Sequence, residues 1–505
     1  MPVIQPARNL PGTVLPVARL SRPGAMDYCI FMSTTTADDT NSSSAPRERG
    51  TFAFVSLGCP KNLVDSERML GKLAMEGFSL VGDAAEADVV VVNTCGFIEP
   101  ARQESLGVLR EMVELKTGGK VKAVIAAGCL AERDREGLRD QVPGLDHLVG
   151  VFGREEIAQA VELSLERIGA KRGKKRIAVE ELKGIFSPAP VKALEDTARL
   201  RATPQHYAYL KISEGCDRLC TFCAIPQMRG KHVSKAIEEI VREARELISD
   251  GVRELCLVAQ DSTYYGIDLY GEPRLAPLLR ELDALDGLDW IRLHYAYPEH
   301  VTDELVDVLA NARHIVPYID MPLQHISDRV LRRMNRKTTR AATEEIVGRL
   351  RQRIPGLVLR STFLVGFPGE TEAEFNELVD WVREAKIERL GVFPYSHEPT
   401  TPSAKLDGAV PEEEKLRRRD VLMATQQEVA FAHAESRVGQ TLAVIIDGPD
   451  PEMPGWYLGR TMADAPDIDP VARIKAKSLE SGSIIQADIT GFDGYDLLGR
   501  PARRR

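Results

Sequence analysis

The sequence predicts an α/β protein that combines two series of strand–helix repeats with a small all-β domain. Short apolar runs alternate with helical patterns over residues 51–185 and again over 205–435, as expected for parallel sheets covered by helices. Residues 437–505 instead show short alternating runs broken by Gly, Pro and Asp, which is typical of a small antiparallel barrel. The 505 residues exceed what one hydrophobic core can hold, so several domains are expected.

Residues 1–50 are expected to be a disordered N-terminal extension. The stretch 33–44 consists entirely of Ser, Thr, Asp, Asn and Ala, which cannot bury enough apolar surface to fold. Cys29, in this extension, is expected to have no role. The sequence has no export signal at its start and no apolar run long enough to cross a bilayer. We therefore expect a cytoplasmic protein with no membrane partner, whose eight cysteines are metal ligands or core thiols rather than disulfides.

Residues 51–185 are expected to form a doubly wound α/β domain. Its predicted buried parallel strands are residues 52–57, 88–92 and 123–127. Helical patterns follow the strands, and the basic run 171–176 marks a linker to the next domain.

Residues 205–435 repeat the strand-then-helix theme about six times, which predicts an incomplete (β/α)6 barrel. The expected strands are residues 207–212, 254–259, 290–294, 315–319, 358–365 and 390–395. Cys256 alternates within the second of these strands and is expected to belong to the core. A charged helical stretch over 412–435 is expected to close the domain.

Three cysteines directly after the first barrel strand are the strongest chemical signal. Cys216, Cys220 and Cys223 form a C-x3-C-x2-C pattern. Three thiolates on a [4Fe–4S] cube leave one iron open, and that iron can chelate the amine and carboxylate of S-adenosylmethionine. One-electron reduction then yields a 5′-deoxyadenosyl radical. Zinc is the alternative, but structural zinc prefers four ligands, and no fourth Cys or His nearby fits.

This spacing after the first strand of a β/α barrel resembles the radical-SAM superfamily. The residues that the resemblance implies for the cofactor pocket are Gln260, Asp261, Arg360, Thr362, Val392 and Phe393. The first two would meet the methionine amine, the next two would lie near the ribose and adenine, and the backbone of the last two would pair with adenine. The alternative is that these residues only pack at strand ends.

A second set of three cysteines is spread along the N-terminal domain. Cys59, Cys95 and Cys129 each follow one of the predicted strands. Ligand crevices in doubly wound sheets form at the carboxyl ends of strands, so these cysteines should meet there. Three buried structural thiols are the alternative. Because the next domain is already predicted to hold a cluster, the shared position at strand ends favours a second [4Fe–4S] cluster. The glycines expected to let the backbone approach this bulky group are Gly58, Gly96 and Gly128.

The two cysteine sets in this order, followed by a small barrel, resemble the methylthiotransferases of the radical-SAM superfamily. The resemblance covers about residues 51–505, and the C-terminal barrel is similar to a TRAM domain. Three segments resemble the branch of the family that modifies a ribosomal protein, the RimO type. They are Ser56–Glu67, Gln260–Gly266 and Met321–Asp328.

The resemblance also implies the reaction and the partners. The substrate would be one aspartate of small-subunit ribosomal protein S-twelve, which receives a methylthio group on its β-carbon. One S-adenosylmethionine would donate the methyl group and another would form the radical, while the auxiliary cluster carries the sulfur. The expected electron donor is a flavodoxin or ferredoxin, and a monomer is expected. Catalytic acid and base residues stay unassigned: His294, Tyr295 and Tyr297 face the expected substrate region, but packing explains them equally well.

The charge of the last domain indicates the partner more weakly. Residues 437–505 contain nine Lys and Arg and ten Asp and Glu, whereas an RNA-binding module normally presents a basic surface. An acidic barrel suits a basic ribosomal protein, or is merely a solvated face. The alternatives to the ribosomal-protein enzyme are a tRNA (adenosine) methylthiotransferase and a non-catalytic iron–sulfur assembly factor.

Overall fold

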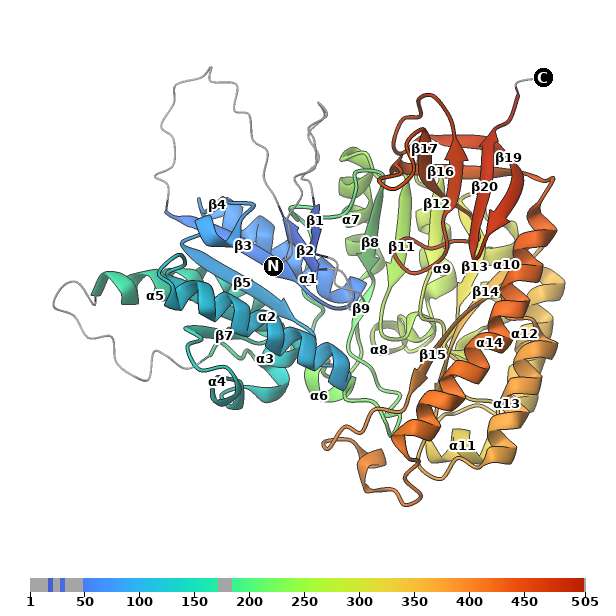
Figure 1. Ribbon diagram of the computed structural model, residues 1–505, viewed down its shortest axis with the longest axis horizontal. Helices are drawn as coiled ribbons and strands as arrows, with labels where there is room; N and C mark the ends of the chain where they lie inside the picture. Colours follow the sequence, from blue (N-terminus) through green and yellow to red (C-terminus); the bar gives the residue numbers. More distant parts are fainter. Residues whose placement is uncertain (1–16, 21–27, 32–48, 171–183, 504–505) are drawn as a thin grey trace. The chain divides into compact units, whose positions relative to one another are not determined.

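The computed structural model describes residues 17–20, 28–31, 49–170 and 184–503 (Figure 1). Two compact units make up the chain. The N-terminal unit comprises Met1–Thr203 and Ala224–Lys231, and the C-terminal unit comprises Pro204–Cys223 and His232–Arg505. The predicted basic linker, 171–176, lies outside the described residues. Within the described ranges, no helix has both the length and the apolarity needed to cross a membrane.

The N-terminal unit contains the predicted doubly wound sheet. Its parallel strands are β3 (Thr51–Ser56), β5 (Val89–Thr94), β6 (Ala123–Gly128) and β7 (His147–Val149), adjacent in that order, with β4 (Ser79–Leu80) also beside β3. The first three confirm the strands predicted from the apolar runs. Every residue of β5 and β6 is buried, because helices cover both faces of the sheet.

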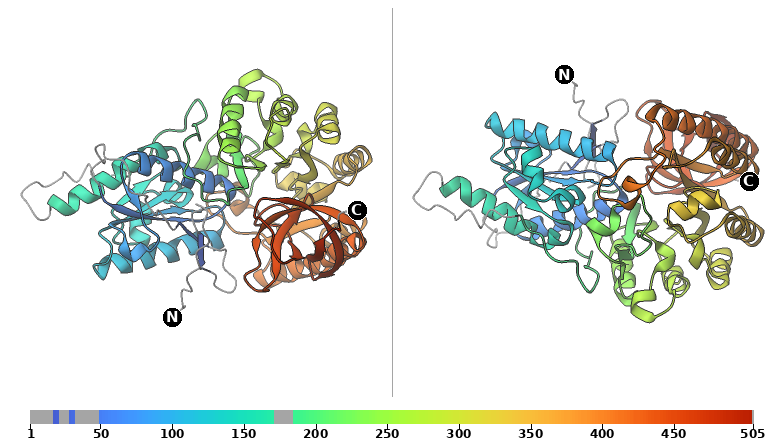
Figure 2. Two further views of the ribbon diagram at one scale, coloured as in Figure 1. Left: turned by 90° about the horizontal axis from the view of Figure 1, so that it is seen from above. Right: turned by 90° about the horizontal axis from the view of Figure 1, so that it is seen from below.

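Alternate residues of the strands separate the two faces. Val90 and Val124 pack on one side, with α2 (Glu99–Thr117), α3 (Cys129–Asp134) and α4 (Gly137–Gln141). Val91 and Ile125 pack on the other, with α1 (Pro60–Met75) and α5 (Ile157–Ala170). Figure 2 shows these helices on both sides of the sheet. The short 3-10 helices of this unit are Ala84–Glu86 and Val151–Glu156.

Part of the N-terminal extension is ordered, contrary to the prediction of disorder for residues 1–50. β1 (Val17–Leu20) and β2 (Tyr28–Phe31) form an antiparallel pair, and β2 pairs antiparallel with β3. The prediction followed the polar stretch 33–44, which lies outside the described residues, and overlooked the β-favouring run Tyr-Cys-Ile-Phe that can join the free edge of β3.

The C-terminal unit contains the predicted incomplete barrel. Its six parallel strands are β8 (Tyr207–Lys211), β11 (Glu254–Val258), β12 (Trp290–Leu293), β13 (Ile315–Asp320), β14 (Val358–Val365) and β15 (Arg389–Pro394). They lie in this order from β8 to β15, and the sheet is not closed. The main outer helices are α7 (Ile237–Ser249), α9 (Leu275–Asp283), α10 (Asp303–Asn311), α12 (Arg340–Arg353), α13 (Glu372–Ala385) and α14 (Glu412–Arg437). Cys256 is fully buried within β11, as predicted.

A closed five-stranded barrel completes the chain. Its strands are β16 (Thr441–Pro449), β17 (Trp456–Thr461), β18 (Ala472–Lys475), β19 (Ile484–Asp493) and β20 (Asp496–Pro501). The predicted antiparallel arrangement holds for four pairs, but β18 and β20 are parallel. An odd number of strands cannot alternate direction around a closed ring, so one parallel pair is unavoidable.

A buried ionic network joins this small barrel to the amino ends of the central strands. Glu254, the first residue of β11, accepts hydrogen bonds from Arg292 Nε at 2.8 Å and from Arg460 Nη1 at 2.5 Å. Arg460 also pairs with Asp447 of β16 at 3.0 Å. Burial alone would raise the pKa of Glu254, but Arg460 and Arg292 hold it below its ordinary value. Glu254 is therefore an ionised group between two guanidinium groups.

Further carboxylates of the small barrel point into the same joint. Asp464 pairs with Arg389 of β15 at 2.7 Å, and Asp469 accepts from the Tyr318 hydroxyl at 2.7 Å. Asp467 accepts from the Tyr207 hydroxyl at 3.1 Å. The acidic residues counted in 437–505 are thus largely occupied within the chain, which removes the composition argument for an acidic docking face.

Candidate metal centres

The N-terminal triad, Cys59, Cys95 and Cys129, lies at one edge of the sheet. Cys59 caps α1 after β3, Cys95 follows β5, and Cys129 begins α3 after β6. These three parallel strands are adjacent, so their carboxyl ends bring the cysteines together. A Cβ added to Gly58 would lie 3.1 Å from Cys95 Sγ, which places the Cys59 loop against Cys95.

The thiols of this triad influence one another. Burial first, and then the negative charges of Cys129 and Cys59, raise the pKa of Cys95 to about 12. Burial likewise raises the pKa of Cys129 to about 11. Burial would also raise the pKa of Cys59, but Lys61 and Arg229 bring it below its ordinary value. Cys59 also stands at a helix N-terminus, which favours a thiolate.

The sequence predicts that the flanking glycines let the backbone approach an inorganic group, and this stays a prediction. In the structure they lie against residues of the neighbouring loops. Gly58 has φ +92°, and a Cβ there would meet Cys95; a Cβ on Gly96 would lie 3.0 Å from the Cα of Leu130. Gly128 has φ +87° and lies against Asn93. These glycines let the three cysteine loops pack against one another.

Arg229 reaches this triad, although nothing in the sequence pattern indicates it. It ends α6 (Ile225–Arg229), in the segment Ala224–Lys231 that follows Cys223 but packs in the N-terminal unit. Its Nε lies 3.3 Å from Cys129 Sγ, and its Nη2 lies 3.1 Å from Asn62 Oδ1 and 3.0 Å from Asp65 Oδ2. The Arg229 side chain is 1% exposed. A buried arginine is recognisable only once its partners are in place.

The central triad, Cys216, Cys220 and Cys223, occupies the loop after β8 and β9 (Ser213–Glu214). Cys220 is buried and the other two are partly exposed. The loop is fastened by Thr221 N, which donates to Met334 O at 3.0 Å, and by Asn335 Nδ2, which donates to Leu219 O at 2.9 Å. Burial raises the pKa of Cys216 to about 11.

Tyr297 lies between two guanidinium groups beside this loop. Arg218 lies 4.0 Å and Arg336 lies 4.1 Å from its ring centre. Arg336 Nη1 is 3.9 Å from Cys220 Sγ, and Arg218 N is 3.5 Å from Cys216 Sγ. Cationic and N–H groups are therefore directed at two of the three thiols.

Two residues predicted to meet the methionine amine make polar contacts within the C-terminal unit. Gln260 Nε2 donates to Glu214 Oε1 at 2.7 Å. Asp261 accepts from Arg218 Nε at 2.5 Å and from Thr263 Oγ1 at 2.7 Å. Asp261 thus ties the end of β11 to the loop of the central triad.

The remaining predicted cofactor residues lie on the last two barrel strands. Arg360 pairs with Asp320 at 3.0 Å and with Asp469 at 3.5 Å. Thr362 and Val392 are half-buried and buried, and Phe393 is exposed on β15, the last strand of the sheet. The assignment of all six residues to the cofactor stays a prediction.

The sequence left His294 and Tyr295 without an assigned role, and the structure shows their surroundings. His294 Nδ1 lies 3.8 Å from Asp320, and Tyr295 has φ +59°. His294 is buried at the end of β12, near Arg360 through their shared partner Asp320. Neither the His294–Asp320 contact nor the backbone conformation of Tyr295 identifies a catalytic acid or base.

The donor set suits clusters better than single ions. Among the described residues, no three His, Cys, Asp or Glu side chains are grouped closely enough to hold one metal ion. A structural zinc site needs such a group, normally of four ligands. In a [4Fe–4S] cube each thiolate binds a different iron, so its ligands lie further apart than those of one ion. Each triad supplies the three thiols that such a cube needs if one iron is to stay open.

Comparison with known proteins identifies the family. The model of the radical SAM superfamily matches residues 210–382, that of the uncharacterized protein family UPF0004 matches 51–150, and that of the TRAM domain matches 438–501. The ribosomal protein uS12 methylthiotransferase RimO of Symbiobacterium thermophilum is 44% identical over 88% of this chain and 90% of its own length. That of Pelotomaculum thermopropionicum is 45% identical over 89% and 98%. The chain belongs to the RimO family.

Membership in the RimO family confirms the predicted methylthiotransferase resemblance, and with it a transferase. Among solved structures, the radical S-adenosylmethionine methyltransferase TsrM of Kitasatospora setae has a TM-score of 0.50 at 16% identity, covering 81% of this chain and 77% of that one. At this identity the likeness concerns the fold alone.

Proposed function

We propose that this RimO-family protein installs a methylthio group on the β-carbon of one aspartate of ribosomal protein uS12. The names of its relatives support the substrate. The observation that carries the chemistry is the presence of two separate cysteine triads, one at the carboxyl ends of three parallel strands and the other on the loop that follows β8 and β9, each in its own unit. Each triad would hold one [4Fe–4S] cluster.

The central triad would hold the cluster that, when loaded, reduces and cleaves S-adenosylmethionine. The chain's own contribution is to keep the three thiols on one fastened loop and to direct N–H groups at two of them. The backbone N–H of Arg218 and the guanidinium of Arg336 are directed at Cys216 and Cys220. Such donors favour the thiolate that iron binds.

The pocket for S-adenosylmethionine would lie over the carboxyl ends of the barrel strands. We assign Gln260 and Asp261 to the methionine part of the cofactor. Arg360 and Thr362 would lie near the ribose and adenine. The backbone of Val392 and Phe393 on β15 would pair with adenine. Asp261 supports this proposal because it already holds Arg218, next to the first cysteine. It would thereby orient the cofactor and the cluster loop together.

The N-terminal triad would hold the auxiliary cluster that carries the sulfur. Because burial raises the pKa values of Cys95 and Cys129, both thiols are protonated at neutral pH without metal, and cluster binding must expel these protons. Cys59, with its lowered pKa, would supply the first thiolate.

An acidic one-electron carrier, a flavodoxin or ferredoxin, would reduce the enzyme. Leu219, in the central triad's loop, is 62% exposed, and the exposed side chains of Arg332 and Lys337 flank the residues that fasten this loop. An apolar tip with basic neighbours suits an acidic partner. We propose that the protein acts as a monomer.

The direct test is mass spectrometry of uS12 after anaerobic incubation with the reconstituted enzyme, S-adenosylmethionine, sulfide and a reductant. A mass increase for a methylthio group on one aspartate is expected. Parallel digestion of tRNA from the same mixture provides the comparison. A methylthio group on tRNA with none on uS12 would leave the chemistry intact and overturn the substrate.

A further inference from the structure

Arg229 is a buried arginine beside the N-terminal triad, and the proposed reaction assigns it no role. Its guanidinium is buried and contacts Cys129 Sγ, Asn62 Oδ1 and Asp65 Oδ2. Burying a charge is costly unless it is paired and hydrogen-bonded. The contact to sulfur is the one that a purely structural arginine would not need.

Arg229 belongs to a row of alternating positive and negative side chains. Asp65 lies between Arg229 and Arg154, and Arg154 also pairs with Asp196 at 2.7 Å. Asp65 therefore shares its charge between two arginines. Arg229 Nε, on the same guanidinium, donates to Cys129 Sγ at 3.3 Å.

Hydrogen bonds to cysteine sulfur and nearby positive charge both stabilise the reduced, more negative state of an iron–sulfur cluster. Arg229 supplies both to Cys129. The position of α6 gives this contact further meaning, because the segment begins directly after Cys223 of the central triad. One stretch of chain thus supplies the last ligand of one triad and the hydrogen-bond donor of the other.

We propose that Arg229 is a positioning residue that sets the reduction potential of the auxiliary cluster through Cys129 Sγ. The inference rests on the proposed second cluster. Arg229 raises the potential, and Asp65 limits this effect by neutralising part of its charge. Removal of either side chain should therefore shift the potential, in opposite directions.

The test uses the full-length chain with the central triad replaced by alanine, so that electron paramagnetic resonance reports one cluster. In this background, Arg229→Gln should lower the ratio of reduced to oxidised cluster at a fixed solution potential about tenfold, equivalent to a shift of about 59 mV for one electron. Arg229→Lys should restore part of the ratio, because the charge remains but the fork geometry is lost. Asp65→Asn should raise the ratio.

The matched control is Arg133→Gln. Arg133 is also a largely buried arginine beside the triad, but its Nη1 donates to the Gly96 carbonyl at 2.8 Å rather than to sulfur. This variant removes a positive charge but no hydrogen bond to sulfur, so it should change the ratio clearly less than Arg229→Gln does. Iron content is measured for every variant, so that changes in potential are compared at equal loading.

An Arg229→Gln protein with full iron content and the parent's potential would overturn the inference. If that variant failed to fold or to take up iron, Asp65→Asn would decide, since Arg229 is retained there: an unchanged or lowered ratio refutes the proposal. A parent protein without iron in the N-terminal triad would refute the second cluster itself, and the role of Arg229 with it.

Discussion

Replacing Glu254 by Gln should destabilise the C-terminal unit strongly. The change keeps the size of the side chain but removes the carboxylate that pairs with two guanidinium groups, all three side chains being at most 3% exposed. Arg460 keeps Asp447, whereas Arg292 keeps a hydrogen bond to the Met462 carbonyl and the ring of Tyr318. Breaking a buried ion pair in this way costs about 3–5 kcal/mol.

Urea unfolding followed by tryptophan fluorescence measures the stability of the C-terminal unit specifically. The chain has three tryptophans, Trp290, Trp381 and Trp456, and all lie in the C-terminal unit. The control is Arg280→Gln, which breaks the pair with Glu304 in the same unit; both side chains are about half exposed. An exposed pair contributes about 0–1 kcal/mol. Equal free energies of unfolding for the Glu254→Gln and Arg280→Gln proteins would refute the role assigned to the network.

The same network predicts the outcome of removing the small barrel. Without residues 437–505, Glu254 would lose Arg460, and Arg389 would lose Asp464. We therefore expect such a chain to lose the stability of the central barrel, and with it cleavage of S-adenosylmethionine, rather than losing only a surface for its partner.

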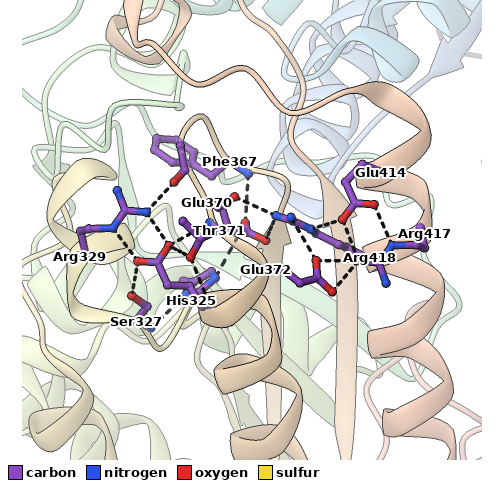
Figure 3. A network of polar contacts seen from close by, with 12 residues as sticks. His325, Ser327, Arg329, Phe367, Glu370, Thr371, Glu372, Glu414, Arg417 and Arg418 are labelled. Carbon is purple, nitrogen blue, oxygen red and sulfur yellow. Dashed lines mark hydrogen bonds and ion pairs between the residues drawn. The ribbon is translucent and has the colours of Figure 1, made fainter.

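Three further predictions concern the metal centres and a buried histidine. Replacing the N-terminal triad with alanine should remove about half of the iron of the reconstituted protein, as should replacing the central triad; full iron after the first change would contradict two clusters. Cys216→Ala should abolish formation of 5′-deoxyadenosine, whereas Cys95→Ala should spare it but stop methylthio transfer, both measured by chromatography and mass spectrometry. Burial lowers the pKa of His325 to about 3, and Ser327 N donates to its Nδ1 at 3.0 Å (Figure 3). Only the unfolded chain then gains this proton as the pH falls below about 6.5, so at pH 4.5 the wild type should lose roughly 2–3 kcal/mol of stability from this site. His325→Asn should lose less over the same interval in thermal melts, and equal acid sensitivity would show that His325 is protonated in the folded state.

The sequence predicted those features that depend on local pattern. Apolar runs such as Val89–Val92 identify buried strands, because a parallel sheet covered on both faces needs apolar residues at successive positions. The cysteines that follow these strands could be placed at one sheet edge from topology alone. The family resemblance then supplied the chemistry.

Features that depend on partners distant in the chain could not be predicted. Counting charges in 437–505 could not reveal that Asp464 and Asp469 contact the central strands rather than solvent. Arg229 likewise stands in a stretch with no recognisable pattern, and its contact with Cys129 spans 100 residues of sequence. Charge composition and spacing describe a side chain's chemistry but not which group it meets.

The placement of α6 has a consequence for how the chain folds as it is synthesised. Domains generally fold as units, the N-terminal one first, as the chain emerges. Here the N-terminal unit lacks Met228 and Arg229 until Ala224–Lys231 has emerged, and β8 and the central cysteine loop, which precede this segment, emerge before it. The part of the N-terminal triad's surroundings that includes Met228 and Arg229 therefore forms late. Iron–sulfur loading of that triad should accordingly follow release of at least the first 231 residues, rather than begin on a nascent chain that ends at Thr203.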